Sequence, residues 1–462
     1  MGTVFLTRPA QSVEHYKDAI LDVLGETGNV AQFVSFSPTL DQRYSRITGR
    51  ERNHRFDSSK QAISSLMSSS VERRINLRSF DPKRHQGNEF IYGLQNVDAA
   101  LQELERLTSS GLHVIANETI DVNDGGVSGV AQGDLLEFAP GGTPRVVESA
   151  GITSISRSLG TELLSKVYGF LLDLPEDRDL RIEFSIHPLK RGFRQAHTVL
   201  WEVQEIEHGS LDASLNWPNT FSQFIGDKTF GLLIADCLGW NVPYTTVISR
   251  GLPPFSFGRM TEADMKWMRT SPRKAEPGYF PTYRGWRDPF KMIAEEGSEE
   301  RLAAVLVQSE VPSVYSGAVI TGVDEKPIVE GVAGFGDRFM MGEAAPVDLP
   351  PNVLLLLNDL HDSARAKLGS VRLEWAFDGR KVWVIQLQKE EALSNGSVIV
   401  PGNFGDEVTF DPRQGLDELR SLIERVQDKG CSIRVRGNIG MTSHMADVLR
   451  RSRIPSRIVH MA

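Results

Sequence analysis

The stretch VRLEWAFDGRKVWVIQLQ, Val371–Gln388, is the part of the sequence that decides the fold. We expect it to form two neighbouring strands, with the carboxylate of Glu374 on one and the carboxamide of Gln386 on the other, pointing to one face. Oxygen donors of this kind suit Mg²⁺, which takes its remaining ligands from water and phosphate. The pattern therefore predicts a magnesium site, and solvent-facing strand polarity is the alternative.

The same pattern occurs earlier in the chain and indicates an internal repeat. RIEFSIHP, starting at Arg181, parallels VRLEWAFDG, and LWEVQ, ending at Gln204, parallels VWVIQ. This alignment pairs Glu183 with Glu374 and Gln204 with Gln386. Three further matches precede them in the same order, all at offsets of 182 to 191 residues: VIANE with VLVQS, VSGV with YSGA, and PRVVE with KPIVE. Two related half-domains are therefore expected, near residues 107–206 and 300–390.

Length and local pattern set the organisation of the rest of the chain. At roughly 100–200 residues per domain, 462 residues favour two to four domains. Mixed short strands and helices predict α+β domains. The Pro- and Gly-rich stretch Gly251–Arg287 reads as a long irregular connection or a lid. Apolar spacing predicts a strand at 3–6 and helices at 13–24, 160–172, 229–238, 352–368 and 416–426.

Composition excludes several classes of protein. A net charge of −9 does not suggest a nucleic-acid binder, and no apolar run approaches the roughly 20 residues of a membrane span. The N-terminus lacks the order of a signal peptide. Because Cys237 and Cys431 are the only cysteines, we expect no disulfide framework and a cytoplasmic location. Between Arg43 and Arg84, however, eleven Lys and Arg residues face only four acidic ones, which forms either a solvated surface or an anion-binding wall.

Four segments in a fixed order resemble a known family. GDKTFGLLIADCLGWNVPYTTVI (Gly226–Ile248) is followed by VLVQSEVPSVYSGAVIT, PIVEGVAGFGDRFMMGE and VRLEWAFDGRKVWVIQLQ. This order is similar to the nucleotide-binding part of phosphoenolpyruvate synthase, pyruvate phosphate dikinase and rifampicin phosphotransferase, which has an ATP-grasp fold. The resemblance implies ATP and Mg²⁺ as cofactors, with Lys228 on the phosphates and Glu374 and Gln386 on the metal. It also places around the nucleotide Gln308, Glu330, Gly334 and Gly336.

The phosphate-binding arginine is less easily assigned. INLRSFDP (Ile75–Pro82) resembles the family's Arg-Ser-Ser motif, which would put Arg78 in a nucleotide site. The first unit lacks the lysine segment, however, and the second has no clear Arg-Ser-Ser motif. Arg284 and Arg287 are candidates for the missing role in the second unit, and completion of that site by Arg78 across a domain interface is the alternative.

The C-terminal stretch GMTSHMADVLRRSRIPSRIV, Gly440–Val459, resembles the phosphohistidine motif of the same family. His444 occupies the histidine position. A neutral imidazole is nucleophilic near pH 7, and a helix N-terminus favours a phosphoryl group. Thr442 or Ser443 is expected to cap that helix. The alternative is a surface histidine beside a cap.

Together these features predict duplicated ATP-grasp-like units at 1–206 and 207–392, followed by a small swivelling phosphohistidine-like α/β domain at 393–462. The resemblance implies a dikinase-like ATP-dependent phosphotransferase, with a phosphohistidine at His444, an unidentified small-molecule acceptor, and AMP and phosphate as products. An ATP-grasp ligase that releases ADP and a non-catalytic nucleotide-binding module are the alternatives. No membrane or nucleic-acid partner is expected, and a homodimer is one compatible assembly. Two positions depart from the family pattern, Asp227 in place of glycine and Gln388 in place of arginine.

Overall fold

The computed structural model describes residues 29–459, apart from residue 71 and the segments 82–83, 120–123, 142–150, 170–171, 173, 175–178, 189–196, 206–214, 275–281 and 296–300. The strand and helix expected at 3–6 and 13–24 lie outside the described residues. The chain divides into two compact units. Unit 1 comprises Met1–Ala150 and Phe170–Ala213, and unit 2 comprises Gly151–Gly169 and Ser214–Ala462.

Unit 1 contains two sheets. The first has the spatial order β3 (Gln42–Arg46), β2 (Phe33–Phe36), β6 (His113–Glu118), β4 (Ile75–Asp81) and β5 (Arg84–Leu94). Helices α2 (Ser59–Ser69) and α3 (Val97–Ser109) pack on this sheet. The second sheet contains, in order, β1 (Asn29–Val30), β11 (His197–Glu205), β10 (Leu180–His187), β7 (Val127–Gln132) and β8 (Leu135–Pro140).

Unit 2 also begins with two sheets. The first has the order β13 (Phe255–Phe257), β12 (Thr245–Ser249), β16 (Leu302–Ser309), β14 (Lys266–Pro272) and β15 (Thr282–Arg284). The second has the order β18 (Pro327–Ala333), β17 (Tyr315–Thr321), β19 (Val371–Phe377) and β20 (Val382–Lys389). The described residues of unit 2 also form a short strand, β9 (Thr153–Ser156), and the helices α4 (Arg157–Tyr168), α5 (Thr220–Ile225), α6 (Asp227–Cys237), α7 (Pro289–Glu295) and α8 (Asp337–Met340).

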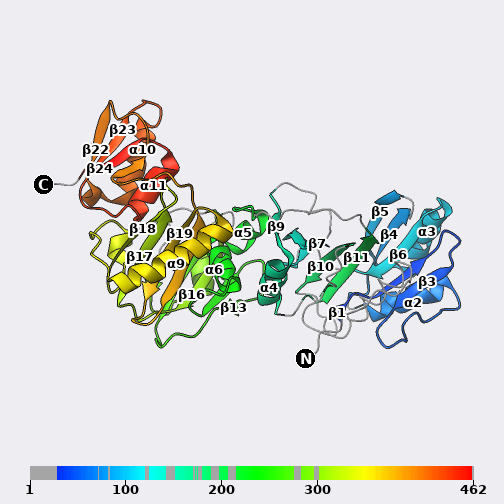
Figure 1. Cartoon of the computed structure of the whole chain (residues 1–462). Helices are drawn as coiled ribbons and strands as arrows, with labels where there is room; N and C mark the ends of the chain where they lie inside the picture. The colour runs from blue at the N-terminus through cyan, green and yellow to red at the C-terminus, as the bar shows by residue number, and fades with distance from the viewer. Residues whose placement is uncertain are drawn as a thin grey trace. The chain divides into compact units, whose positions relative to one another are not determined.

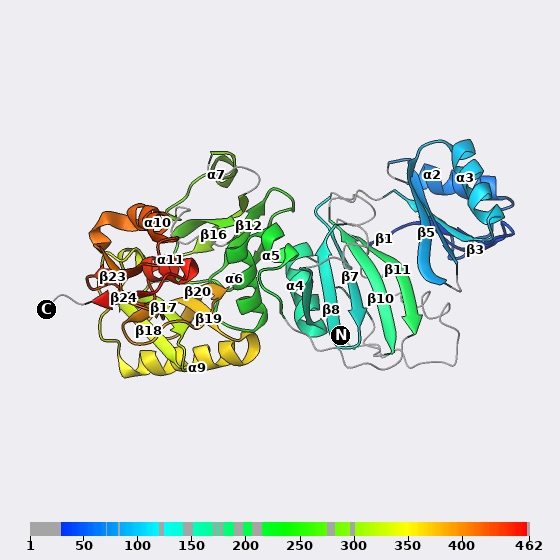
Figure 2. The same ribbon diagram turned by 90° about the horizontal axis from the view of Figure 1, so that it is seen from above.

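Helix α9 (Pro351–Leu368) lies across the β17–β20 sheet (Figures 1 and 2). It starts with proline in its first turn, where no N–H is needed, and ends at Gly369, whose φ of 78° a glycine adopts freely. His361 Nε2 lies 3.0 Å from Thr321 Oγ1, so α9 covers the face of the sheet that carries Thr321. Because strand side chains alternate between faces, Ala318 and its cross-strand neighbour Glu374 point to the opposite face.

The C-terminal part of unit 2 is a small four-stranded sheet, with parallel and antiparallel pairs, that packs with two helices. Its sheet has the order β21 (Val398–Val400), β24 (Ser456–Val459), β23 (Ser432–Arg436) and β22 (Glu407–Phe410), with β22, β23 and β24 parallel. Helices α10 (Gly415–Val426) and α11 (His444–Ser452) share its apolar core. The helices expected at 160–172, 229–238, 352–368 and 416–426 are confirmed, with their ends shifted by a few residues at most.

The two units have matching strand orders. The order β3-β2-β6-β4-β5 corresponds to β13-β12-β16-β14-β15, and β8-β7-β10-β11 corresponds to β18-β17-β19-β20. Glu183 lies opposite Val130 as Glu374 lies opposite Ala318, and a β-bulge follows each glutamate. The sequence pairing of these two glutamates therefore has a counterpart in strand register.

The register corrects one sequence pairing. Gln386 lies opposite Glu374, and the residue opposite Glu183 is Glu202 rather than Gln204. Gln204 lies opposite Arg181, so its counterpart in unit 2 is Gln388.

The stretch Gly251–Arg287 is not an irregular connection. It contains β13, β14 and β15, and β14 is an interior strand of its sheet. The prediction of a lid or linker was therefore wrong for its described residues.

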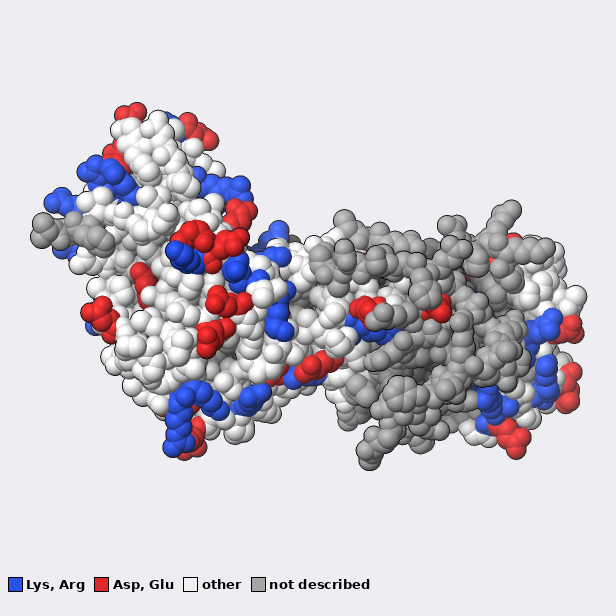
Figure 3. All heavy atoms as spheres, in the orientation of Figure 1, with Lys and Arg blue, Asp and Glu red and all other residues white. Residues whose placement is uncertain are grey.

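Charged side chains of both signs are interspersed on the face of unit 2 that Figure 3 shows. In the described parts of the chain, no helix is both long and apolar enough to cross a membrane.

Candidate active site

A cavity of about 680 Å³ lies within unit 2, and its size is typical of a small-molecule site. Side chains from both large sheets, α6, α8 and α11 line it. The cavity therefore brings together functional side chains that lie far apart in the sequence. Seven of the residues that the sequence singled out are in its lining: Lys228, Arg284, Gln308, Gly336, Glu374, Gln386 and His444. Four others are not among the lining residues: Arg78, Arg287, Glu330 and Gly334.

Lys228 lies in the first turn of α6, and two close approaches fix that turn. Ser271 Oγ accepts a hydrogen bond from Thr229 N at 3.1 Å, and a side chain at Gly226 would overlap this serine. A Cβ at Gly231 would overlap the carbonyl oxygen of Leu387. Glycine at these positions lets α6 lie directly against β14 and β20, which brings Lys228 to the cavity.

The Lys228 ammonium has an unusual environment. Burial and the nearby Arg269 guanidinium lower its pKa to about 8, although Glu374 and Asp227 oppose the shift. Two cations thus lie together in a partly dry site, an arrangement that favours a polyanion such as a triphosphate.

Arg269 is the arginine that the sequence analysis missed. It lies opposite Leu306 on β16, as Arg78 lies opposite Ile115 on β6, so the two arginines occupy equivalent positions of the two units. Arg269 lines the cavity and donates a hydrogen bond from Nη1 to Ile385 O at 3.1 Å. The signal in the sequence is Arg269-Thr270-Ser271, a variant of the motif found around Arg78.

Arg284, which lines the cavity, and Arg287, which does not, both contact other side chains. Arg284 donates two hydrogen bonds to Glu310, at 2.6 and 2.9 Å, and its guanidinium lies 4.7 Å from the centre of the Phe335 ring. Arg287 lies over the Tyr283 ring at 3.4 Å. Arg269, rather than Arg284 or Arg287, therefore occupies the position in unit 2 that corresponds to Arg78 in unit 1.

Glu374 and Gln386 lie opposite each other on β19 and β20, and both line the cavity. Burial raises the pKa of Glu374, but the surrounding cations, Arg269 among them, outweigh it and the net shift is downward. Glu374 Oε1 is buried and has no hydrogen-bond partner among the residues that the structure describes. An ionised, unpartnered carboxylate oxygen beside a carboxamide fits a hard cation.

No group of three or more His, Cys, Asp or Glu side chains suited to a metal occurs in the described segments. A cation at Glu374 and Gln386 would therefore take its other ligands from phosphate and water, as Mg²⁺ usually does.

The glycine-rich turn after β18 is only partly in the cavity. Gly334 adopts a φ of 75° and donates from its N–H to Val314 O at 2.8 Å, which shapes the turn. Phe335 and Gly336 follow it and line the cavity. Gln308 is almost fully buried in the opposite wall.

His444 is the first residue of α11 and reaches the same cavity. Ser443 caps the helix by accepting a hydrogen bond from Ala446 N at 3.4 Å. Burial lowers the pKa of His444 to about 4, and Glu374 only partly offsets this. The imidazole is therefore neutral at pH 7. Its Nδ1 is buried without a partner in the described part of the chain.

The two departures from the family pattern are in contact. Gln388 Nε2 donates to Asp227 Oδ2 at 3.3 Å, and Trp217 Nε1 donates to Asp227 Oδ1 at 2.7 Å. Burial raises the pKa of Asp227 despite these hydrogen bonds. The Asp227 carboxyl group, at the first residue of α6, is thus held by two neutral hydrogen-bond donors.

The chain matches no known family model and no curated protein. Parts of it align with D-alanine-D-alanine ligase from Helicobacter pylori (10% identity, TM-score 0.26, 38% of this chain and 56% of that chain). They also align with a RimK domain ATP-grasp protein from Sphaerobacter thermophilus DSM 20745 (16% identity, TM-score 0.22, 36% of this chain and 58% of that chain). A third alignment is with VanG D-Ala:D-Ser ligase from Enterococcus faecalis (11% identity, TM-score 0.24, 36% of this chain and 52% of that chain). This chain thus spans only 52 to 58% of those chains. Similarities at this level do not assign it to a family.

Proposed function

We propose that the cavity of unit 2 binds Mg-ATP and that the protein is an ATP-dependent enzyme with an ATP-grasp-like nucleotide site. One observation carries the proposal: Lys228, Arg269, Glu374, Gln386 and His444, from five separate elements, line a single cavity. The two cations and the unpartnered carboxylate suit phosphoryl transfer from Mg-ATP, and the neutral imidazole adds a nucleophile.

Each group has a distinct role in this proposal. Lys228 and Arg269 bind the phosphates and neutralise their charge. Glu374 and Gln386 would hold Mg²⁺, which supplies further charge neutralisation when bound. In-line displacement at phosphorus then depends mainly on positioning and on this electrostatic stabilisation.

His444 is proposed to accept a phosphoryl group. Because Nδ1 is buried, we assign Nε2 as the nucleophile. Its lone pair attacks the β-phosphorus of ATP, an N–P bond forms, the bond from that phosphorus to the oxygen shared with the α-phosphate breaks, and AMP leaves. Water then cleaves the anhydride of the pyrophosphoryl group on His444, which releases phosphate and leaves one phosphoryl group on the imidazole. An acceptor hydroxyl then takes the phosphoryl group and its proton passes to solvent. With one water consumed, ATP and the acceptor yield AMP, phosphate and the phosphorylated small molecule.

A ligase is the second candidate. Lys228, Arg269 and Glu374 belong to α6, β14 and β19, so the phosphate-binding groups are complete without His444. Such a site could transfer the terminal phosphoryl group of ATP to a substrate carboxylate, with ADP leaving. An amine would then displace phosphate from the acyl phosphate.

We also infer that unit 1 is an altered copy of the same fold, because its strand orders and the positions of Arg78 and Glu183 match those of unit 2. The segment 393–462 then corresponds to a phosphohistidine-like domain.

The test is to incubate the protein with Mg-ATP, with and without a metabolite extract, and to identify the nucleotide product and the protein mass. AMP formation, together with a one-phosphoryl adduct that is stable to base, labile to acid and absent in His444→Ala, supports the histidine route. ADP formation that persists in His444→Ala supports the ligase. ATP binding without any turnover would contradict both and leave a nucleotide-binding module.

A further inference from the structure

The turn that precedes His444, Gly440–Ser443, is held on the sheet by a carboxylate of β18. Glu330 Oε1 accepts a hydrogen bond from Met441 N at 3.1 Å. Glu330 Oε2 accepts two more, from Thr442 N at 2.8 Å and from Thr442 Oγ1 at 2.9 Å. One side chain therefore satisfies the N–H groups of the turn, although it lies 111 residues away in sequence.

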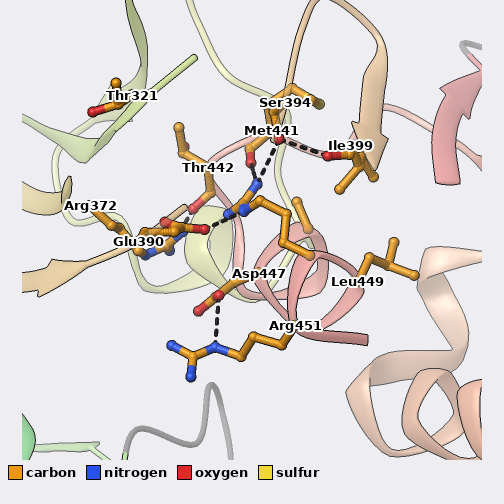
Figure 4. Close-up of polar contacts among 12 residues, drawn as sticks. Thr321, Arg372, Glu390, Ser394, Ile399, Met441, Thr442, Asp447, Leu449 and Arg451 are labelled. Carbon is orange, nitrogen blue, oxygen red and sulfur yellow. Dashed lines mark hydrogen bonds and ion pairs between the residues drawn. The ribbon is translucent and has the colours of Figure 1, made fainter. Parts of the chain in front are cut away.

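The opposite side of the turn is held by a guanidinium of β19. Arg372 Nη2 donates to Thr442 O at 2.6 Å, a contact that Figure 4 shows. Arg372 is only 2% exposed, and its Nε and Nη1 atoms have no partner among the described residues. Thr442 is thus held by hydrogen bonds from both sides: its N–H donates to Glu330, and its carbonyl accepts from Arg372.

Close packing also fixes the position of the Gly440–Ser443 turn. A Cβ at Gly440 would lie 2.6 Å from Phe339 Cε2 and 2.8 Å from Glu330 Oε2, so only glycine allows the approach. Arg450 of α11 also holds the turn, because it donates a hydrogen bond to Met441 O at 2.8 Å and pairs with Glu390, which follows β20.

Negative charge surrounds Arg372. Burial opposes its positive charge, but the carboxylates of Asp447, Glu390, Glu374 and Glu330 outweigh burial and raise its pKa. A phosphoryl group on His444 would add about 1.5–2 further negative charges next to Glu374 and Asp447. The Arg372 guanidinium acts electrostatically on His444, and its Nε and Nη1 atoms, which have no partner among the described residues, are donors that suit such an anion.

We propose that Glu330 and Arg372 are positioning residues, which clamp Thr442 so that His444 is held in the ATP cavity, and that phosphorylation of His444 loosens this clamp. The unmodified turn is held from both sides. Once His444 carries a phosphoryl group, Arg372 exchanges the Thr442 carbonyl for phosphoryl oxygens, and repulsion from Glu374 on β19 favours departure of the turn. This inference rests on the proposed function and specifies how its histidine step is controlled.

The clamp is tested on the full chain without nucleotide, by amide hydrogen exchange of the peptide that covers Gly440–Ser443. Glu330→Gln and Arg372→Gln should accelerate exchange there by about tenfold or more, as expected when a hydrogen bond to a charged group is lost. Glu325→Gln and Arg380→Gln are matched controls on exposed turns of the same sheet and should change nothing. Unchanged exchange in Glu330→Gln, the milder variant, would overturn the clamp.

Comparing the rate of His444 phosphorylation with the Kd for Mg-ATP separates a positioning role from a general structural role. Glu330→Gln should slow phosphorylation of His444 by about tenfold or more while the Kd for Mg-ATP stays within about twofold of the wild type. A parallel loss of ATP affinity would contradict the positioning role.

Loosening is tested by repeating the exchange measurement during incubation with Mg-ATP. Exchange in the turn should rise in the wild-type protein and not in His444→Gln. Equal exchange in both, with the wild type phosphorylated, overturns the loosening alone. If the wild type binds ATP but gains no phosphoryl group, the histidine route and the loosening both fail, and the nucleotide-free measurement still decides whether the clamp exists.

Discussion

Arg269 Nη1 lies 4.0 Å from Glu374 Oε2, and this pair joins the two large sheets of unit 2 at the cavity. The distance is too long for a direct hydrogen bond, and both side chains are largely buried. Two opposite charges held apart in a partly dry site can each bind a further ion: the guanidinium a phosphate, and the carboxylate a divalent cation. Mg-ATP presents both ions at once.

Arg269→Ala should therefore weaken Mg-ATP binding by about tenfold or more, the usual effect of losing a charge-assisted hydrogen bond. Calorimetric titration of the full chain measures the change. Arg78→Ala is the matched variant in unit 1 and should leave the Kd of the unit 2 site unchanged. An equal loss in both variants would contradict the assignment of Arg269 and restore a role for Arg78.

The affinity for ATP should fall as the pH rises through about 8. Lys228 has a pKa of about 8, so it is charged below that pH and neutral above it, and only the charged form attracts phosphates. Binding measured between pH 6.5 and 9.5 checks this. Lys228→Met should bind more weakly at low pH and lose the dependence, and a wild-type profile that is flat across pH 8 would contradict it.

His444 should stay neutral well below the usual range of histidine. Burial lowers its pKa in the folded protein to about 4, below the ordinary histidine value of 6.5, so the unfolded chain binds more protons between these values. The free energy of unfolding should then rise with pH from about 4 to 6.5 and level off above. Urea unfolding of the wild type and of His444→Gln measures this contribution, which the variant should lack. An imidazole NMR resonance of His444 that titrates near pH 6.5 would contradict the prediction.

Gly231→Ala should destabilise unit 2 by about 2–4 kcal/mol, in the range of overpacked core sites, and abolish ATP binding. The added Cβ overlaps Leu387 O and pushes α6, with Lys228, away from β20. Thermal unfolding and calorimetry measure the two effects. Gly405→Ala is the control, because its Cβ would meet atoms only at 3.5 Å or more. Equal stability of both variants would contradict the packing argument.

Local signals predicted a large part of the fold. The apolar spacing of 352–368, with proline before it and glycine after it, was sufficient for α9. The pair Glu374 and Gln386 was predicted from two strand-like runs, and the structure places them opposite each other. These features depend on residues close in sequence, so the local sequence pattern is sufficient to predict them.

The remaining features depend on register and on distant contacts. Arg269 was missed because β14 lies within a stretch rich in Pro and Gly, which hides an interior strand. Gln204 was wrongly paired with Gln386, because strand register, not similarity of letters, decides that Glu202 lies opposite Glu183. The contacts of Glu330 with Met441 and Thr442 join segments more than 100 residues apart, which no local pattern reveals.

The hydrogen bond between Asp227 and Gln388 has an evolutionary consequence. Each side chain satisfies the other in the interior, so a change at either position alone would strand a buried polar partner. A sequence that changes one of these two residues should therefore change the other as well.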